Sequence, residues 1–141
     1  MSETDAPQRM ILAGGSIHNP NEPRHFMAIK PVAGRVRILL DGRVLAQSEN
    51  ALRVIEVGRK FYDPVLYLPR VDVVANLARA ARQTECPLKG RASYFDLADE
   101  SDRPIVEEIA WSYEQTFDFA AELDARIAFD AAKVVIEESP A

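Results

Sequence analysis

The chain has 141 residues, with 17 Lys and Arg against 22 Asp and Glu, a net charge of −5 and one cysteine. This length predicts one domain, which buries about two-thirds of its extended surface and needs no disulfide to fold. The acidic balance argues against a general nucleic-acid-binding protein. No apolar run reaches the ~20 residues of a membrane span, and the start, residues 1–5, is acidic where a secretory signal would be basic. We therefore expect a cytoplasmic protein with neither nucleic acid nor a membrane as partner.

The first segment, residues 1–25, is predicted to be a flexible arm. Pro7, Pro20 and Pro23, together with two adjacent glycines, interrupt any helix or strand period. Gly14-Gly15-Ser16 has neither the spacing nor the Lys-Ser/Thr ending of a phosphate-binding loop. The single β domain is therefore expected to span residues 26–141.

Short runs of alternating apolar residues follow and predict β-strands. They cover residues 35–40, 44–46, 51–57 and 64–68. Asp41-Gly42, between the first two runs, is typical of a two-residue hairpin turn. In the third run, alternation places Glu56 on the same face as Leu52 and Val54, so a carboxylate is predicted on the apolar side.

The next segment has the spacing of a helix. Val71, Val74, Leu77, Ala78 and Ala81 recur at helical intervals, and Pro69 stands just before them, which predicts a helix over about 70–82. Two further strand-like runs, 92–97 and 105–113, are predicted to form a hairpin, with polar residues 98–103 as its loop.

Three blocks of sequence resemble a family called domain of unknown function 427 (DUF427), found in bacteria and fungi. They are Tyr-Leu-Pro-Arg at 67–70, Cys-Pro-Leu-Lys-Gly-Arg-Ala-Ser-Tyr at 86–94 and Ala-Trp-Ser-Tyr at 110–113. The resemblance extends over about residues 29–137. It departs from the family pattern after His25 and after Tyr113, where the family has proline.

The resemblance implies a mainly β, tent-like domain: two small antiparallel sheets meeting at an angle, with short marginal helices at about 70–82 and 118–124. Helix propensity alone favours one long helix across residues 117–138, whereas the resemblance implies strands at 127–129 and 134–137. Related architectures hold zinc on two cysteine pairs, which one cysteine cannot supply. We expect no metal and no cofactor. The family also carries a nucleotidyltransferase label, but neither a glycine-serine loop with paired aspartates nor an equivalent supports it here.

Three residues are candidates for catalysis: Glu56, Cys86 and Lys89. Cys86, in a turn ahead of Lys89, could be a nucleophile whose thiolate the ammonium favours; the alternative is a small buried apolar side chain. Glu56 could act as general acid or base if it is buried beside a cation. The alternative for Glu56 is a strand end that has already reached solvent.

Six residues are candidates for ligand binding. Aromatic rings with polar tips and two cations near turns could together line a cleft. They are Tyr67, Arg70, Lys89, Tyr94, Trp111 and Tyr113. The alternative is that the rings fill the core and the cations lie on the surface.

Three functions remain open from the sequence. The first is a domain that binds a polar or anionic small molecule in a cleft lined by aromatic residues, Lys89 and Glu56. The second is an enzyme that uses the same cleft, with Cys86 or Lys89 assisting Glu56. The third is a protein-interaction module that offers a strand edge or an aromatic surface. The sequence gives neither the ligand nor the oligomeric state.

Overall fold

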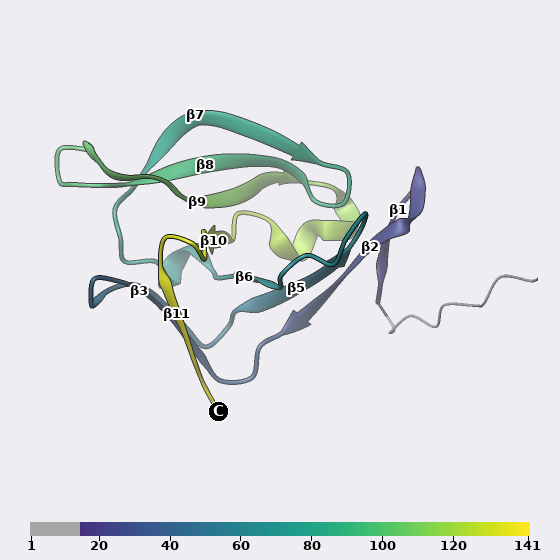
Figure 1. The fold of residues 1–141 in the computed structure, drawn as a ribbon, viewed down its shortest axis with the longest axis horizontal. Helices are drawn as coiled ribbons and strands as arrows, with labels where there is room; N and C mark the ends of the chain where they lie inside the picture. The colour runs from purple at the N-terminus through teal and green to yellow at the C-terminus, as the bar shows by residue number, and fades with distance from the viewer. Residues whose placement is uncertain (1–14) are drawn as a thin grey trace, which may run out of the picture.

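The computed structural model describes residues 15–141, which form three antiparallel sheets (Figure 1). The first sheet has the order β1 (Ile17–Asn19), β2 (Glu22–Pro31), β5 (Leu52–Val57), β6 (Val65–Tyr67). The second has the order β10 (Ile127–Phe129), β9 (Pro104–Thr116), β8 (Gly90–Ala98), β7 (Leu77–Cys86). The third has the order β11 (Val135–Ser139), β3 (Arg35–Leu40), β4 (Arg43–Ser48). Two 3-10 helices, η2 (Arg70–Asp72) and η3 (Asp118–Leu123), lie between strands.

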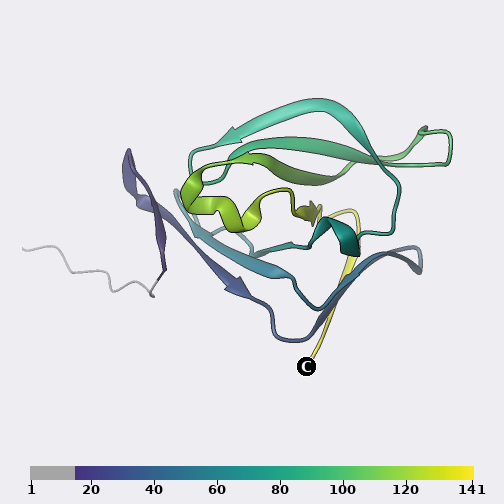
Figure 2. The same cartoon turned by 180° about the vertical axis from the view of Figure 1, so that it is seen from behind.

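The first and second sheets are joined where β6 meets β10. Leu68 and Ile127 exchange two backbone hydrogen bonds, each 2.8 Å long. In both views the second sheet lies above and the first below, with η3 between them (Figures 1 and 2). The two sheets therefore share one face that is turned inward around η3 and a second face on the opposite side.

Strand alternation divides the core between these two faces. Tyr67 of β6 belongs to the inner cluster, with Met27, Val54 and Tyr113, whereas its neighbour Leu66 belongs to the outer cluster. The outer cluster packs against the third sheet and includes Val36, Ile38, Phe95 and Phe129. The inner face is the one that carries the candidate site.

The predicted mainly β architecture of antiparallel sheets is confirmed, although the strands form three sheets where the resemblance implied two. The Asp41-Gly42 hairpin turn is also confirmed, with φ angles of 49° and 79° that match the left-handed conformation such turns require. In the tail, the implied short helix and both strands are present as η3, β10 and β11. The long helix that propensity alone favours does not form.

The helix predicted over 70–82 is wrong. Only η2 is helical, and residues 77–86 form β7, which pairs with β8 alone and is therefore an edge strand. Val71 and Val74, which made up part of the helical period, are 89% and 74% exposed and pack against no core. Backbone pairing with β8 outweighs the helix propensity of the alanines and arginines in this segment.

The irregular arm expected over residues 1–25 is also corrected for its described part. β1 and the beginning of β2 form a hairpin, in which Ile17 pairs with Met27 and His18 with Phe26. Pro20 and Asn21 form the turn, and Pro23 lies within the register shift between Glu22 and Phe26, where proline is tolerated. Residues 1–14, including Gly14, lie outside the described residues. Within residues 15–141, no helix has the length and apolar character that crossing a membrane requires.

Candidate functional site

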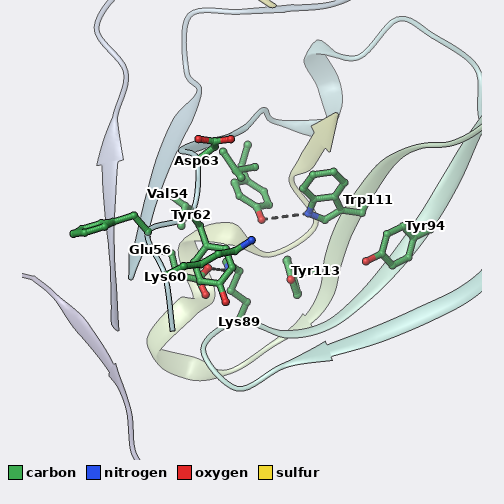
Figure 3. Close-up of a pocket in the computed structure, with 12 residues that line it drawn as sticks. Val54, Glu56, Lys60, Tyr62, Asp63, Lys89, Tyr94, Trp111 and Tyr113 are labelled. Carbon is green, nitrogen blue, oxygen red and sulfur yellow. Dashed lines mark hydrogen bonds and ion pairs between the residues drawn. The ribbon is translucent and has the colours of Figure 1, made fainter. Parts of the chain in front are cut away.

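A cavity of about 450 Å³ opens on the inner face between the first and second sheets (Figure 3). The walls come from four places: β5 with the loop after it, β6, the β7–β8 turn, and the middle of β8 and β9. All four tyrosines of the chain and its only tryptophan line this cavity. They are Tyr62, Tyr67, Tyr94, Tyr113 and Trp111. Hydroxyl-bearing aromatic side chains are thus concentrated in one place.

An ion pair lies at one end of the cavity. Lys89 Nζ is 2.5 Å from Glu56 Oε1, and their side chains are only 7% and 15% exposed. The alternation of β5 directs Glu56 to the inner face, as the sequence predicts. The turn fixes Lys89, because its backbone N–H donates to the Cys86 carbonyl and Gly90 follows with a φ of 125° that favours glycine.

Both members of the ion pair are stabilised in their charged forms. Burial alone would raise the pKa of Glu56, but the Lys89 ammonium and hydrogen bonds from His25 and Lys89 bring that pKa below its ordinary value. Burial alone would lower the pKa of Lys89, but the surrounding ionisable groups, Tyr67, Cys86 and Glu56, raise it above its ordinary value. At neutral pH the pair is therefore a carboxylate beside an ammonium.

The second oxygen of Glu56 is held by His25. His25 Nε2 lies 2.7 Å from Glu56 Oε2, and its Nδ1 lies 3.2 Å from the amide nitrogen of Asn19. The amide orientation of Asn19 is set because its Oδ1 accepts the backbone N–H of Asn21. Asn19 therefore donates to Nδ1, which places the imidazole proton on Nε2, where it is donated to Glu56. The result is a continuous chain of hydrogen bonds from Asn19 to Lys89.

The aromatic wall keeps hydrogen-bond donors available to the cavity. Trp111 Nε1 donates to the Tyr67 hydroxyl at 3.3 Å, which leaves the Tyr67 proton free to be donated elsewhere (Figure 3). The Tyr113 hydroxyl has no hydrogen-bond partner within residues 15–141, whereas Tyr94 shares a hydrogen bond with Thr84. Burial raises the pKa of Tyr67 to about 12, and burial together with Tyr67 raises the pKa of Tyr113. Both phenols therefore stay protonated.

Most of the predicted site residues are brought together by the fold. Glu56, Tyr67, Lys89, Tyr94, Trp111 and Tyr113 all line the one cavity. Arg70 does not, because its guanidinium lies 5.4 Å from the centre of the Phe95 ring, which belongs to the outer cluster. Cys86 Sγ lies 3.7 Å from Lys89 Nζ, but the residue borders a separate hollow with Pro87 and Phe117. Residues 15–141 contain no group of three or more histidine, cysteine or acidic side chains placed to hold a metal.

Four polar residues that line or adjoin the cavity were missed by the sequence reasoning: His25, Lys60, Tyr62 and Asp63. His25 was assigned to the irregular arm, yet it alternates with Met27 and Ile29 along β2, which is the signal that could have placed it on the inner face. The other three belong to the short loop after β5, for which no period exists to read.

The fold and the site together define an antiparallel β domain in which two joined sheets enclose an aromatic cavity closed at one end by a buried ion pair. Residues 28–139 match the profile of the family described as domain of unknown function (DUF427). The chain belongs to this family, which confirms the resemblance seen in the three sequence blocks. No curated protein matches the chain.

Proposed function

We propose that this protein binds a small polar or anionic molecule in the aromatic cavity. The observation that carries the proposal is the collection of every tyrosine and the only tryptophan around a buried ammonium, with hydroxyl protons still available. A cavity of about 450 Å³ is within the ordinary range for small-molecule sites. We place the protein in the cytoplasm as part of the same proposal, since its one cysteine needs no oxidising compartment.

The chemistry of the walls indicates the kind of ligand. Lys89 and the hydroxyls of Tyr67 and Tyr113 are donors, so they suit a carbonyl, carboxylate or phosphoryl oxygen. Tyr94 and Trp111 lie opposite each other on β8 and β9 with ring centres 6.5 Å apart, which suits contact with a planar ring. The ligand we propose therefore combines a flat apolar part with an oxygen-rich end.

An enzyme that uses the same cavity is the second proposal, favoured by the contact of Cys86 with Lys89 and of Lys89 with Glu56. Binding ranks first because the environment moves the pKa of Glu56 down and that of Lys89 up. Proton transfer at neutral pH is most efficient when the pKa lies near 7. The second proposal would replace the first if the wild-type protein converts a bound ligand to product and the Glu56→Gln variant binds that ligand without converting it.

Trp111 makes the binding proposal directly testable. A metabolite collection is first screened by thermal shift, since a ligand of the folded state at 100 times its Kd adds about 2.7 kcal/mol of stability. Each hit is then titrated against the fluorescence excited selectively in tryptophan. Because the chain has one tryptophan and it lines the cavity, a ligand bound there changes this signal.

Two variants test whether a ligand found in the screen binds in the aromatic cavity. Tyr113→Phe removes one donor at nearly constant volume, and we expect the hit's Kd to rise about tenfold. Lys89→Met removes the ammonium and is matched by Lys133→Met, whose amine bonds a backbone carbonyl on the surface and should leave the Kd unchanged. A hit with the same affinity for wild type, Tyr113→Phe and Lys89→Met would overturn the proposal.

A further inference from the structure

A second cavity, of about 640 Å³, lies beside the first. Tyr62 borders both cavities. Next to it, Glu56 borders the first cavity and His25 the second, and their side chains meet at 2.7 Å. The two spaces are therefore adjacent, and a ligand can reach from one to the other across Tyr62, which is 41% exposed.

The second cavity is positively charged in a protein that is acidic overall. Its walls carry Arg24 and Arg59 against one carboxylate, Glu22, which gives a formal charge of 2 − 1 = +1. Arg59 has no ion pair or hydrogen bond within residues 15–141. Arg24 is only loosely paired, since its Nε lies 3.5 Å from Glu22 Oε1 and its side chain is 89% exposed. Two guanidinium groups are thus available to an anion.

The two cationic residues of the loop after β5, Arg59 and Lys60, border different cavities. Gly58 N–H donates to the Lys60 carbonyl and Tyr62 N–H to the Glu56 carbonyl, so the loop is a tight turn. Arg59 then borders the second cavity, whereas Lys60 borders the first. A Cβ at position 58 would lie 3.2 Å from both His25 Cδ2 and Tyr62 Cε2, so glycine lets these two side chains pack closely against the turn.

We propose that the second cavity binds the phosphate or carboxylate tail of the ligand whose flat part occupies the first cavity. This inference rests on the proposed function and adds to it the class of ligand: an aromatic compound with an anionic tail. Arg59 is the principal anion ligand, because a guanidinium offers paired N–H donors that match two oxygens of a phosphate or carboxylate. Arg24 and Tyr62 line the same cavity. The Glu22 carboxylate opposes the anion.

The second cavity, which we call the tail site, is tested alone with inorganic phosphate at constant ionic strength. Binding is followed by the ¹H–¹⁵N chemical shifts of Gly58 and of residue 59. Wild type should show saturable shifts. Arg59→Gln should weaken phosphate binding about fivefold or more, because a charged hydrogen-bond donor is lost. Glu22→Gln should tighten it about threefold, because the opposing charge is gone. A gain of affinity cannot result from misfolding, and Arg43→Gln on β4 serves as the matched control with unchanged affinity.

The link between the cavities is tested with phenylalkyl phosphates and phenylalkyl carboxylates of increasing chain length. We expect one length to bind more tightly than phosphate, to change Trp111 fluorescence and to lose its advantage in Arg59→Gln. The better of the two head groups identifies the tail. Equal phosphate affinity in wild type, Arg59→Gln and Glu22→Gln overturns the tail site, and phosphate binding with no gain at any length overturns the shared ligand. Neither result alters the Trp111 and Tyr113→Phe measurements, which test the first cavity by itself.

Discussion

Lys89 and Glu56 connect the two joined sheets at one end of the cavity. Glu56 comes from β5 of the first sheet, and Lys89 comes 33 residues later, from the turn between β7 and β8 of the second. The same sheets are joined by backbone hydrogen bonds at Leu68 and Ile127. The ion pair is thus a second connection between the sheets, made by side chains.

Lys89→Met should destabilise the protein by about 3 kcal/mol, the cost of removing one partner from a buried pair. The substitution keeps the long apolar stem but leaves the Glu56 carboxylate buried with His25 as its remaining partner. Urea unfolding at pH 7, followed by circular dichroism, measures the loss.

The double variant Lys89→Met/Glu56→Leu separates charge from packing. It should lose less stability than the two single variants added together, with a coupling energy of at least about 1 kcal/mol. The exposed pair Arg91–Glu85 is the matched comparison, and Arg91→Gln should cost less than about 1 kcal/mol. Strict additivity at Lys89 and Glu56 would show that the pair contributes nothing as a pair.

The stability contributed by the pair should depend on pH at both extremes. The folded pKa of Glu56 is depressed, so its contribution is present above the ordinary value of 4.5 and is lost as the pH falls through the folded pKa. The folded pKa of Lys89 is raised, so its contribution is present below 10.5 and is lost as the pH rises beyond that value. The free energy of unfolding of wild type and Glu56→Gln, compared from pH 3 to pH 7, should differ by a constant amount above about 5.

Below pH 4.5 that difference should shrink, because the wild-type carboxyl becomes protonated and resembles the amide. A difference that persists unchanged to pH 3 would mean that Glu56 stabilises the fold through packing and hydrogen bonding and not through its charge.

Alternation and short turns predicted β3 to β6, β8 and β9, whereas β10 and β11 were predicted only from the family resemblance. Glu56 lies on the face that its strand period assigns to it, and Asp41-Gly42 forms the hairpin that this dipeptide favours. β7 could not be predicted in this way. As an edge strand it has no fully buried residue, so the apolar alternation that marks a strand is absent and the spacing of its alanines imitates a helix.

The site was predictable where residues lie on strands and not where they depend on loops or long-range pairing. Tyr94 and Trp111 follow from their strands, and Lys89 from its turn in the family-like block. Arg70 was misplaced because no period extends through the Tyr-Leu-Pro-Arg turn, and in the structure its guanidinium lies over Phe95 on the outer face. His25 was missed because prolines interrupt the strand pattern of β2. The strand that pairs with β2 on its other side, β5, begins 27 residues after His25, at Leu52.

Gly90→Ala should be more harmful than Gly42→Ala. A Cβ at position 90 would lie 2.0 Å from the Gln115 carbonyl oxygen, so the turn that holds Lys89 must move. Backbone strain and overpacking together should cost about 3 kcal/mol or more. Gly42→Ala is the control, because Gly42 has a φ of 79° and a Cβ there meets nothing within 4 Å. It should cost about 1–2 kcal/mol. Equal losses in urea unfolding would show that the close approach to β9 is relieved at no cost.

The Tyr67 phenol should stay neutral in the folded chain at pH values at which an ordinary tyrosine ionises. Burial raises its pKa to about 12, so the neutral phenol stabilises the folded state below pH 10 and this contribution is lost as the pH rises from 10 towards 12. After a rapid jump to pH 11.5, part of the tyrosinate absorbance at 295 nm should appear at the rate of unfolding. Tyr113, whose pKa is also raised by burial, contributes to the same slow phase. Tyr67→Phe should reduce the amplitude of that phase and leave Tyr113 as its remaining source. Complete absorbance within the mixing time of the wild type would mean that the folded chain does not hold the Tyr67 phenol neutral at pH 11.5.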